Sequence, residues 1–230
     1  IVADIPYLWS PTVERAKETA LWAFMDKLGQ KPAASAEGYR AFWRWSVDNK
    51  EQFWDAVWDF TAVIGDKGAR IFTAGDTFKD SRFFPDAKIN FAENLLRRRD
   101  DAVGMVFRGE DKVERQLTFA QIYDQVSQLR QFLQAQGVEA GDRVAGYLPN
   151  MPETIIAMLA TASLGAIWSS ASPDFGVQGV LDRFGQIEPK IVLAVDGYWY
   201  NGKQIDCRDK VTEVLGKLPS VRQLDRKSVV

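Results

Sequence analysis

The sequence predicts an α/β fold, in which a parallel-sheet βα subdomain follows an N-terminal helical extension. Two observations predict it. From about residue 93 onward, short apolar segments alternate with amphipathic ones, which is typical of right-handed βαβ units. Before that point, most of the tryptophans lie in segments with helical apolar spacing. We therefore expect an extension at residues 1–92 and an incomplete βα subdomain at residues 93–230.

The composition excludes several classes of function. A net charge of -2 over 230 residues argues against a nucleic-acid partner, which requires a clustered basic face. No apolar run reaches the roughly 18–20 residues that span a bilayer, and no signal-peptide pattern is present, so we expect no membrane partner. A lone cysteine, Cys207, cannot form an internal disulfide and favours a cytoplasmic location. The absence of histidine excludes histidine triads and most zinc sites, and we expect no metal site.

Helices are expected throughout the extension. One is predicted at about residues 13–28, after Ser10-Pro11. Asp48 with Glu51 three positions later indicates the N-cap of a second helix, in which aromatic and aliphatic residues recur at helical spacing up to Ile64. We expect this aromatic stripe to be a packing face rather than a ligand platform, and we find no strand pattern in the extension.

The βα subdomain is predicted to begin with a hairpin and a helix. Residues 103–107 and 113–117 alternate as strands do, with a turn at Gly109-Glu110-Asp111 between them. Thr118 and Gln121 match a capping box, and Gly137 ends the helix that follows.

Strands and helices then alternate. Strands are expected at residues 143–148, 166–169 and 191–195, and a last helix is expected around residues 211–218. Asn150 is predicted to cap the helix that Gly165 ends, and Ser172-Pro173 to open the helix that closes before Glu188. Ligands of parallel sheets bind beyond the carboxyl ends of the strands, so the loops at 149–150, 169–175 and 196–203 predict the site.

The loop at 196–203 contains a GxxxxGK match that runs from Gly197 to Lys203. We discount a P-loop, because Gln204 stands where a magnesium-binding hydroxyl is required and aromatic side chains crowd the loop. Lys203 is either a solvated lysine or a phosphate ligand. Its aromatic neighbours Tyr198 and Tyr200 would suit a ligand that carries both a base and phosphates.

Two other groups near this edge receive no catalytic role. The serines at 169–172 would need a lysine base, and no Ser-x-x-Lys occurs in the chain. Small residues leaving a strand end are the simpler interpretation. Asp174 and Glu153 lie near the predicted crevice, but they follow different strands and form no acid–base pair by sequence alone. We assign no catalytic residue.

Residues 167–176, Ile-Trp-Ser-Ser-Ala-Ser-Pro-Asp-Phe-Gly, resemble the IWSS-x-SPDFG motif of acetoacetyl-CoA synthetases. These are AMP-forming acid–CoA ligases of the adenylate-forming superfamily. Segments 8–15, 39–46, 84–96, 117–119, 164–166, 180–189 and 197–203 are similar to the same family, so the resemblance covers nearly the whole chain. Ala171 departs from the cysteine that many members carry there.

The resemblance implies an intact enzyme that activates acetoacetate with ATP and magnesium and transfers the acyl group to coenzyme A. It implies that Lys203, with Tyr200 beside it, lies near the 3′-phosphate of CoA. It also implies that Asp174 and Phe175 lie near the pantetheine path. These four residues are the predicted cofactor-binding residues.

The family's phosphate-binding loop, ribose-binding aspartate and catalytic lysine have no counterpart in this sequence. We therefore expect an N-terminal fragment that is inactive alone and binds none of these cofactors tightly. Two alternatives stay open: a ligase for acetate or propionate, and a non-catalytic scaffold that binds CoA or a nucleotide. The oligomeric state also stays open.

Overall fold

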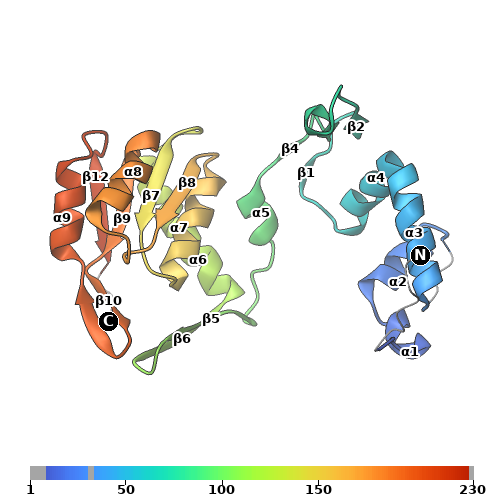
Figure 1. Cartoon of the computed structure of the whole chain (residues 1–230), viewed down its shortest axis with the longest axis horizontal. Coiled ribbons are helices and arrows are strands. Elements are labelled where there is room, and N and C mark those ends of the chain that lie inside the picture. The colour runs from blue at the N-terminus through green and yellow to red at the C-terminus, as the bar shows by residue number, and fades with distance from the viewer. Residues whose placement is uncertain (1–8, 31–33, 228–230) are drawn as a thin grey trace, which may run out of the picture. The chain divides into compact units, whose positions relative to one another are not determined.

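The computed structural model describes residues 9–30 and 34–227 (Figure 1). Contacts divide the chain into two compact units, Ile1–Ile89 and Asn90–Val230. Each unit has its own hydrophobic core.

Within residues 9–30 and 34–60, four helices form the first part of the N-terminal unit. They are α1 (Val13–Lys17), α2 (Ala20–Lys27), α3 (Ala36–Asp48) and α4 (Lys50–Phe60). The prediction of one helix over residues 13–28 was wrong, because Thr19 interrupts it. Its hydroxyl donates to Ala16 O at 2.7 Å and accepts from Trp22 N at 3.2 Å, so Thr19 caps a new helix.

The predicted N-cap at Asp48 was also wrong. Asp48 is the last residue of α3, and Asn49 lies between the two helices. Asn49 donates to Trp45 O twice, from its backbone N at 2.8 Å and from its side-chain Nδ2 at 3.1 Å, and these hydrogen bonds close the last turn of α3. The aromatic stripe of α4 packs inside this unit, since the Phe60 ring lies 5.0 Å from the ring of buried Phe24.

The segment after α4 contains short strands, whereas the sequence predicted none there. β1 (Gly65–Asp66) pairs with β4 (Lys88–Ile89), and β2 (Phe72–Thr73) pairs with β3 (Arg82–Phe83), both antiparallel. A 3-10 turn at Phe78–Asp80 lies between β2 and β3. Each strand has only two residues, so the period-2 alternation that reveals longer strands is missing.

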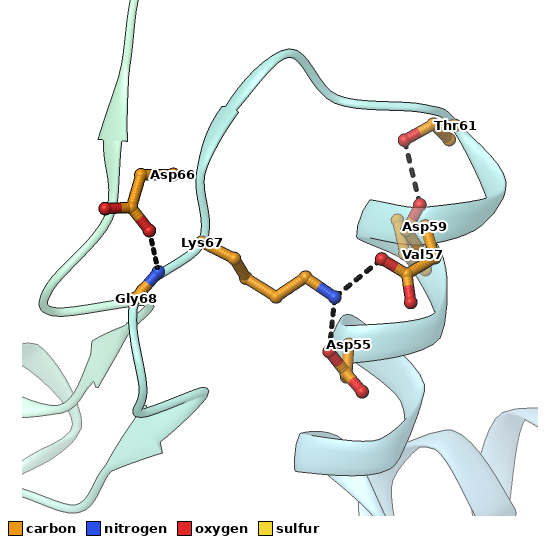
Figure 2. A network of polar contacts seen from close by, with 7 residues as sticks. All are labelled: Asp55, Val57, Asp59, Thr61, Asp66, Lys67 and Gly68. Atoms are coloured by element: carbon orange, nitrogen blue, oxygen red, sulfur yellow. Dashed lines mark hydrogen bonds and ion pairs between the residues drawn. The ribbon is translucent and has the colours of Figure 1, made fainter.

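Lys67 ties this segment to α4 (Figure 2). Its ammonium lies 2.6 Å from Asp55 Oδ1 and 2.6 Å from Asp59 Oδ1. The two aspartates are one helical turn apart, so a single cation bridges both. These hydrogen bonds raise the pKa of Lys67.

The second unit begins with α5 (Phe91–Leu95), followed by the predicted hairpin of β5 (Val103–Gly109) and β6 (Val113–Thr118). The capping box is confirmed: Gln121 N donates to Thr118 Oγ1 at 3.1 Å, and the Gln121 side chain accepts from Thr118 N at 3.0 Å. It opens α6 (Phe119–Ala135), and Gly137 follows with φ +75°. Both ends of this helix therefore lie where the sequence predicted them.

A four-stranded parallel sheet forms the centre of this unit, in the order β12-β9-β7-β8 (Figure 1). Its strands are β7 (Arg143–Tyr147), β8 (Ile167–Ala171), β9 (Ile191–Val195) and β12 (Gln223–Lys227). Every residue of β9 is buried, as expected for a strand covered on both faces. The sequence did not predict β12, because its residues, Gln-Leu-Asp-Arg-Lys, are mostly polar and the strand forms the sheet edge.

Helices cover the sheet in two groups. α7 (Pro152–Ser163) packs with α5 and α6, and α8 (Val177–Ile187) packs with α9 (Arg208–Gly216). Right-handed crossovers to opposite sides of β7 place α7 and α8 on opposite faces. The largest fully buried side chains include Tyr147, Phe184, Leu133, Ile191, Val144 and Val180.

Two predicted helix starts were wrong. The N-cap of α7 is Met151 rather than Asn150, and Pro152 takes the first helical position. α8 begins only after Gly176, not at Ser172-Pro173. β8 runs on to Ala171, and Ser172 then forms a local turn with Asp174 instead of capping a helix.

Candidate functional site

The candidate site lies where the strand order of the parallel sheet reverses. From β7 the chain goes to β8 on one side, and from β8 it crosses to β9 on the other side of β7. The connections after the adjacent strands β7 and β9 therefore leave in opposite directions. Open α/β sheets bind ligands in the crevice that such a reversal leaves at the carboxyl ends of the strands. The segments at this edge are the loop at 172–176 after β8 and the chain that follows β9.

The chain after β9 forms a hairpin rather than the predicted loop. β10 (Gly197–Tyr200) pairs antiparallel with β11 (Lys203–Asp206) around Asn201 and Gly202, whose φ angles are +50° and +70°. Asn-Gly is the dipeptide most typical of a two-residue hairpin turn, so this signal was present in the sequence.

This geometry excludes a P-loop at the GxxxxGK match. Lys203 begins a strand, whereas the lysine of a P-loop opens a helix that cradles phosphate. The next helix, α9, starts at Arg208, beyond β11.

One face of the hairpin carries the predicted residues Tyr200 and Lys203. These two residues lie directly opposite each other, next to the turn, and side chains directly opposite share a face. Tyr198 lies two positions before Tyr200 and so points to the same face. Tyr200 is 61% exposed, and no ion pair or hydrogen bond to the Lys203 ammonium occurs in the part of the chain that the structure describes.

Tyr198 connects this face to the loop after β8. Its hydroxyl donates to Asp174 Oδ1 at 2.5 Å, and the Ser172 hydroxyl donates to Asp174 Oδ2 at 2.8 Å. These two hydrogen bonds, the one from Tyr198 first, lower the pKa of Asp174. Burial and the hydrogen bond to Asp174 raise the pKa of Tyr198. The Asp174 carboxylate is therefore an anchor for the hairpin.

A second tyrosine, Tyr147 at the end of β7, donates hydrogen bonds to the backbone of the same loop. It is 1% exposed, and its hydroxyl donates to Phe175 O at 2.7 Å, with Pro173 O at 3.2 Å. Burial raises the pKa of Tyr147 to about 12. Sequence reasoning missed this residue, because a tyrosine within an apolar strand carries no signal of the loop that it will contact.

The structure brings two of the four predicted residues together, since Tyr200 and Lys203 share one face of the hairpin. Asp174 lies in the loop after β8 and contacts Tyr198 of the same hairpin. The Phe175 ring instead packs against α8, where the Arg183 guanidinium lies 4.2 Å from the ring centroid. Phe175 therefore contributes its backbone carbonyl to the loop, while its side chain is engaged elsewhere.

The remaining candidate groups have structural partners. Glu153, in the first turn of α7, accepts two hydrogen bonds from Arg115, at 2.7 and 2.9 Å, and these raise the pKa of Arg115. Burial raises the pKa of the Cys207 thiol, which is fully buried. Over residues 9–30 and 34–227, no three or more acidic or cysteine side chains gather as metal ligands would.

None of the helices in the described residues has the length and apolar character needed to cross a membrane. Residues 91–230 match the family model described as AMP-binding enzyme. The matched region begins at α5 and includes the parallel sheet and both hairpins.

Known proteins extend the similarity across the N-terminal unit as well. The chain is 53% identical to an acetoacetyl-coenzyme A synthetase of Rhizobium meliloti strain 1021, over 92% of this chain and 32% of the relative. It is 36% identical to the acetoacetyl-CoA synthetase of Macaca fascicularis, over 97% of this chain and 34% of the relative. The solved acetoacetyl-CoA synthetase from Streptomyces lividans is 38% identical, with a TM-score of 0.86, covering 96% of this chain and 35% of that protein. The chain therefore spans about a third of the length of these relatives.

Proposed function

The chain belongs to the AMP-binding enzyme family, and on that premise we propose that it is the N-terminal part of a cytoplasmic ligase that forms acetoacetyl-CoA through an acyl-adenylate. The observation that carries the proposal is the 53% identity to an acetoacetyl-coenzyme A synthetase, which extends over 92% of this chain. The likeness includes the N-terminal unit, which the family model does not match.

The proposed substrates of the whole enzyme are acetoacetate, ATP and CoA, with magnesium as the metal. ATP would supply the activation of the acid, and CoA the thiol that accepts the acyl group. The described residues do not fit the magnesium site, since they form no carboxylate cluster. Adenylation depends on groups that clamp the transferring phosphates. We therefore assign no catalytic residue to this chain and propose that it forms no adenylate alone.

The CoA side of the proposed site does fit residues that are present. Lys203 offers an exposed ammonium at the hairpin turn, and Tyr200 lies opposite it on the same face. Together they suit a nucleotide with a phosphate monoester, because an ammonium binds phosphate as a point charge and an aromatic ring packs against a base. Asp174 and Phe175 are proposed to lie beside the path of the pantetheine arm, in the loop that Tyr147 and Tyr198 hold in place.

Calorimetry with CoA and with dephospho-CoA, which lacks the 3′-phosphate, tests this assignment. We expect Lys203→Ala to weaken CoA binding about tenfold and to leave dephospho-CoA binding unchanged. Lys217→Ala is the matched control, because it removes another exposed ammonium of the same unit, one that pairs with Glu213. A phosphate contact at Lys203 would be contradicted if Lys203→Ala weakened the binding of CoA and of dephospho-CoA equally. It would also be contradicted if Lys203→Ala and Lys217→Ala lost the same affinity for CoA.

A pyrophosphate-exchange assay with acetoacetate tests the proposal about adenylation. We expect no exchange above background from the 230-residue chain. Robust exchange would show that the groups that clamp the phosphates lie within this chain, and our assignment of the site would then be wrong.

A further inference from the structure

The turns of the two hairpins in the second unit meet (Figure 1). Glu110 lies in the connection between β5 and β6. Its carboxylate accepts hydrogen bonds from two successive backbone amides of the β10–β11 turn: Asn201 N at 2.5 Å and Gly202 N at 2.9 Å. Lys112 adds a second contact between the hairpins, with its ammonium 5.8 Å from the centroid of the Trp199 ring.

The two turn amides have the geometry of an anion-binding concavity. Asn201 and Gly202 both have positive φ, and their N–H groups point at one carboxylate. Successive amides in a turn of this kind bind carboxylate or phosphate oxygens. The turn therefore already holds an anion, and that anion is a side chain of the chain itself.

Glu110 adopts a backbone conformation that disfavours its own residue type. Its φ is +54°, in the left-handed region where a side chain with a Cβ is strained and where glycine is the usual residue. A glycine would suit the turn better but would leave the two amides without a carboxylate. The carboxylate is also exposed, so solvent and dissolved anions compete for the amides that it occupies.

We propose that the Asn201–Gly202 turn is a phosphate-binding nest and that Glu110 is its internal competitor, displaced when a phosphate monoester docks beside Lys203. A phosphate dianion carries more charge and more acceptor oxygens than a carboxylate, and Lys203 follows the nest directly in the chain. The proposal rests on the proposed function in one respect: CoA is the expected source of the monoester. Glu110 then keeps the site closed to weaker anions such as free carboxylates.

The test follows the ¹⁵N–¹H signals of Asn201 and Gly202 in the full 230-residue chain at pH 7.5, during titration with inorganic phosphate, CoA and dephospho-CoA. Glu110→Gln removes the competing charge, and Glu110→Gly removes the side chain while relieving the positive φ. Glu114→Gln is the matched control. It removes a carboxylate from the same hairpin, and that carboxylate pairs with Arg108 rather than with the turn amides.

We expect both Glu110 variants to bind CoA and inorganic phosphate about tenfold more tightly than the parent, because a charge-assisted contact of the competitor is lost. The two amide signals should move in the course of both titrations. Dephospho-CoA should leave the two signals in place, and Glu114→Gln should behave as the parent does.

Equal phosphate affinity in the parent, the Glu110 variants and Glu114→Gln would overturn the proposal, as would amide signals that never respond. The proposed function fails separately. If inorganic phosphate moves the two signals but CoA does not bind, the nest stands and the CoA assignment falls. If CoA binds to every variant with the same affinity and the two amide signals do not move, the CoA assignment stands and the proposed nest is wrong.

Discussion

Tyr147→Phe is the most direct test of how the loop at the sheet edge is held. The substitution keeps the aromatic ring in the core and removes only the hydroxyl, which donates to Phe175 O at 2.7 Å. Tyr147 is 1% exposed, so water does not fill the space that the removed hydroxyl leaves. We expect the free energy of unfolding of the second unit to fall.

The size of the loss depends on the two acceptors. A buried hydrogen bond contributes about 1 kcal/mol, and an acceptor left without a donor costs about 1–3 kcal/mol more if water cannot reach it. The hydrogen bond to Phe175 O is only part-buried, so we expect water to replace the lost donor there. Pro173 O keeps the Lys210 ammonium at 3.4 Å. We therefore expect a loss of about 1–2 kcal/mol, near the lower end of the range.

Hydrogen exchange of the β9 amides measures this loss without interference from the N-terminal unit. β9 is buried along its whole length and lies in the interior of the sheet, so its slowest amides exchange only when the unit opens globally. A loss of 1–2 kcal/mol corresponds to exchange about 5- to 30-fold faster.

Tyr123→Phe is the control, because no hydrogen bond from the Tyr123 hydroxyl occurs in the described chain and the ring is covered by the Arg99 guanidinium at 3.8 Å. We expect it to change the exchange rate by less than about 2-fold. If Tyr147→Phe and Tyr123→Phe give the same rates, the Tyr147 hydroxyl does not hold the loop and the reasoning is wrong.

Three further predictions follow from single contacts. Tyr198→Phe removes the hydrogen bond that lowers the pKa of Asp174, so that pKa should rise toward its usual range in a carboxyl ¹³C titration. A lowered carboxyl pKa stabilises the folded state above about pH 4, and this contribution is lost as the pH falls through the folded value, so the variant should lose less stability on acidification than the parent. Phe184→Ala empties a fully buried position on α8 and should lower the free energy of unfolding by about 3–5 kcal/mol in denaturant titrations, with Phe184→Leu losing less. Lys67→Met leaves Asp55 and Asp59 without their shared cation (Figure 2) and should destabilise α4 by about 1 kcal/mol in hydrogen exchange; an unchanged rate would contradict a stabilising role for this bridge.

Local signals predicted the helices and strands of the second unit well. The capping box at Thr118 and Gln121 is confirmed because both of its hydrogen bonds lie within one turn of the chain. Two of the helix predictions failed where a polar residue had two local options. Ser172 bonds to Asp174 in a turn and does not cap α8, and Thr19 divides one expected helix into two. Residue type alone cannot choose between such options, since the hydrogen bonds available are similar in energy.

The amino-acid sequence by itself determined the α/β class, the hairpin of β5 and β6, and the resemblance to acetoacetyl-CoA synthetases, because periodicity, capping and motif spacing are properties of neighbouring residues. Only the tertiary structure decided which side chains share the site. Tyr198 reaches Asp174 across 24 positions, and Glu110 reaches Asn201 across 91. Those contacts depend on the strand order and on the docking of one hairpin against the other. Both arise from long-range packing, which leaves no trace in local spacing.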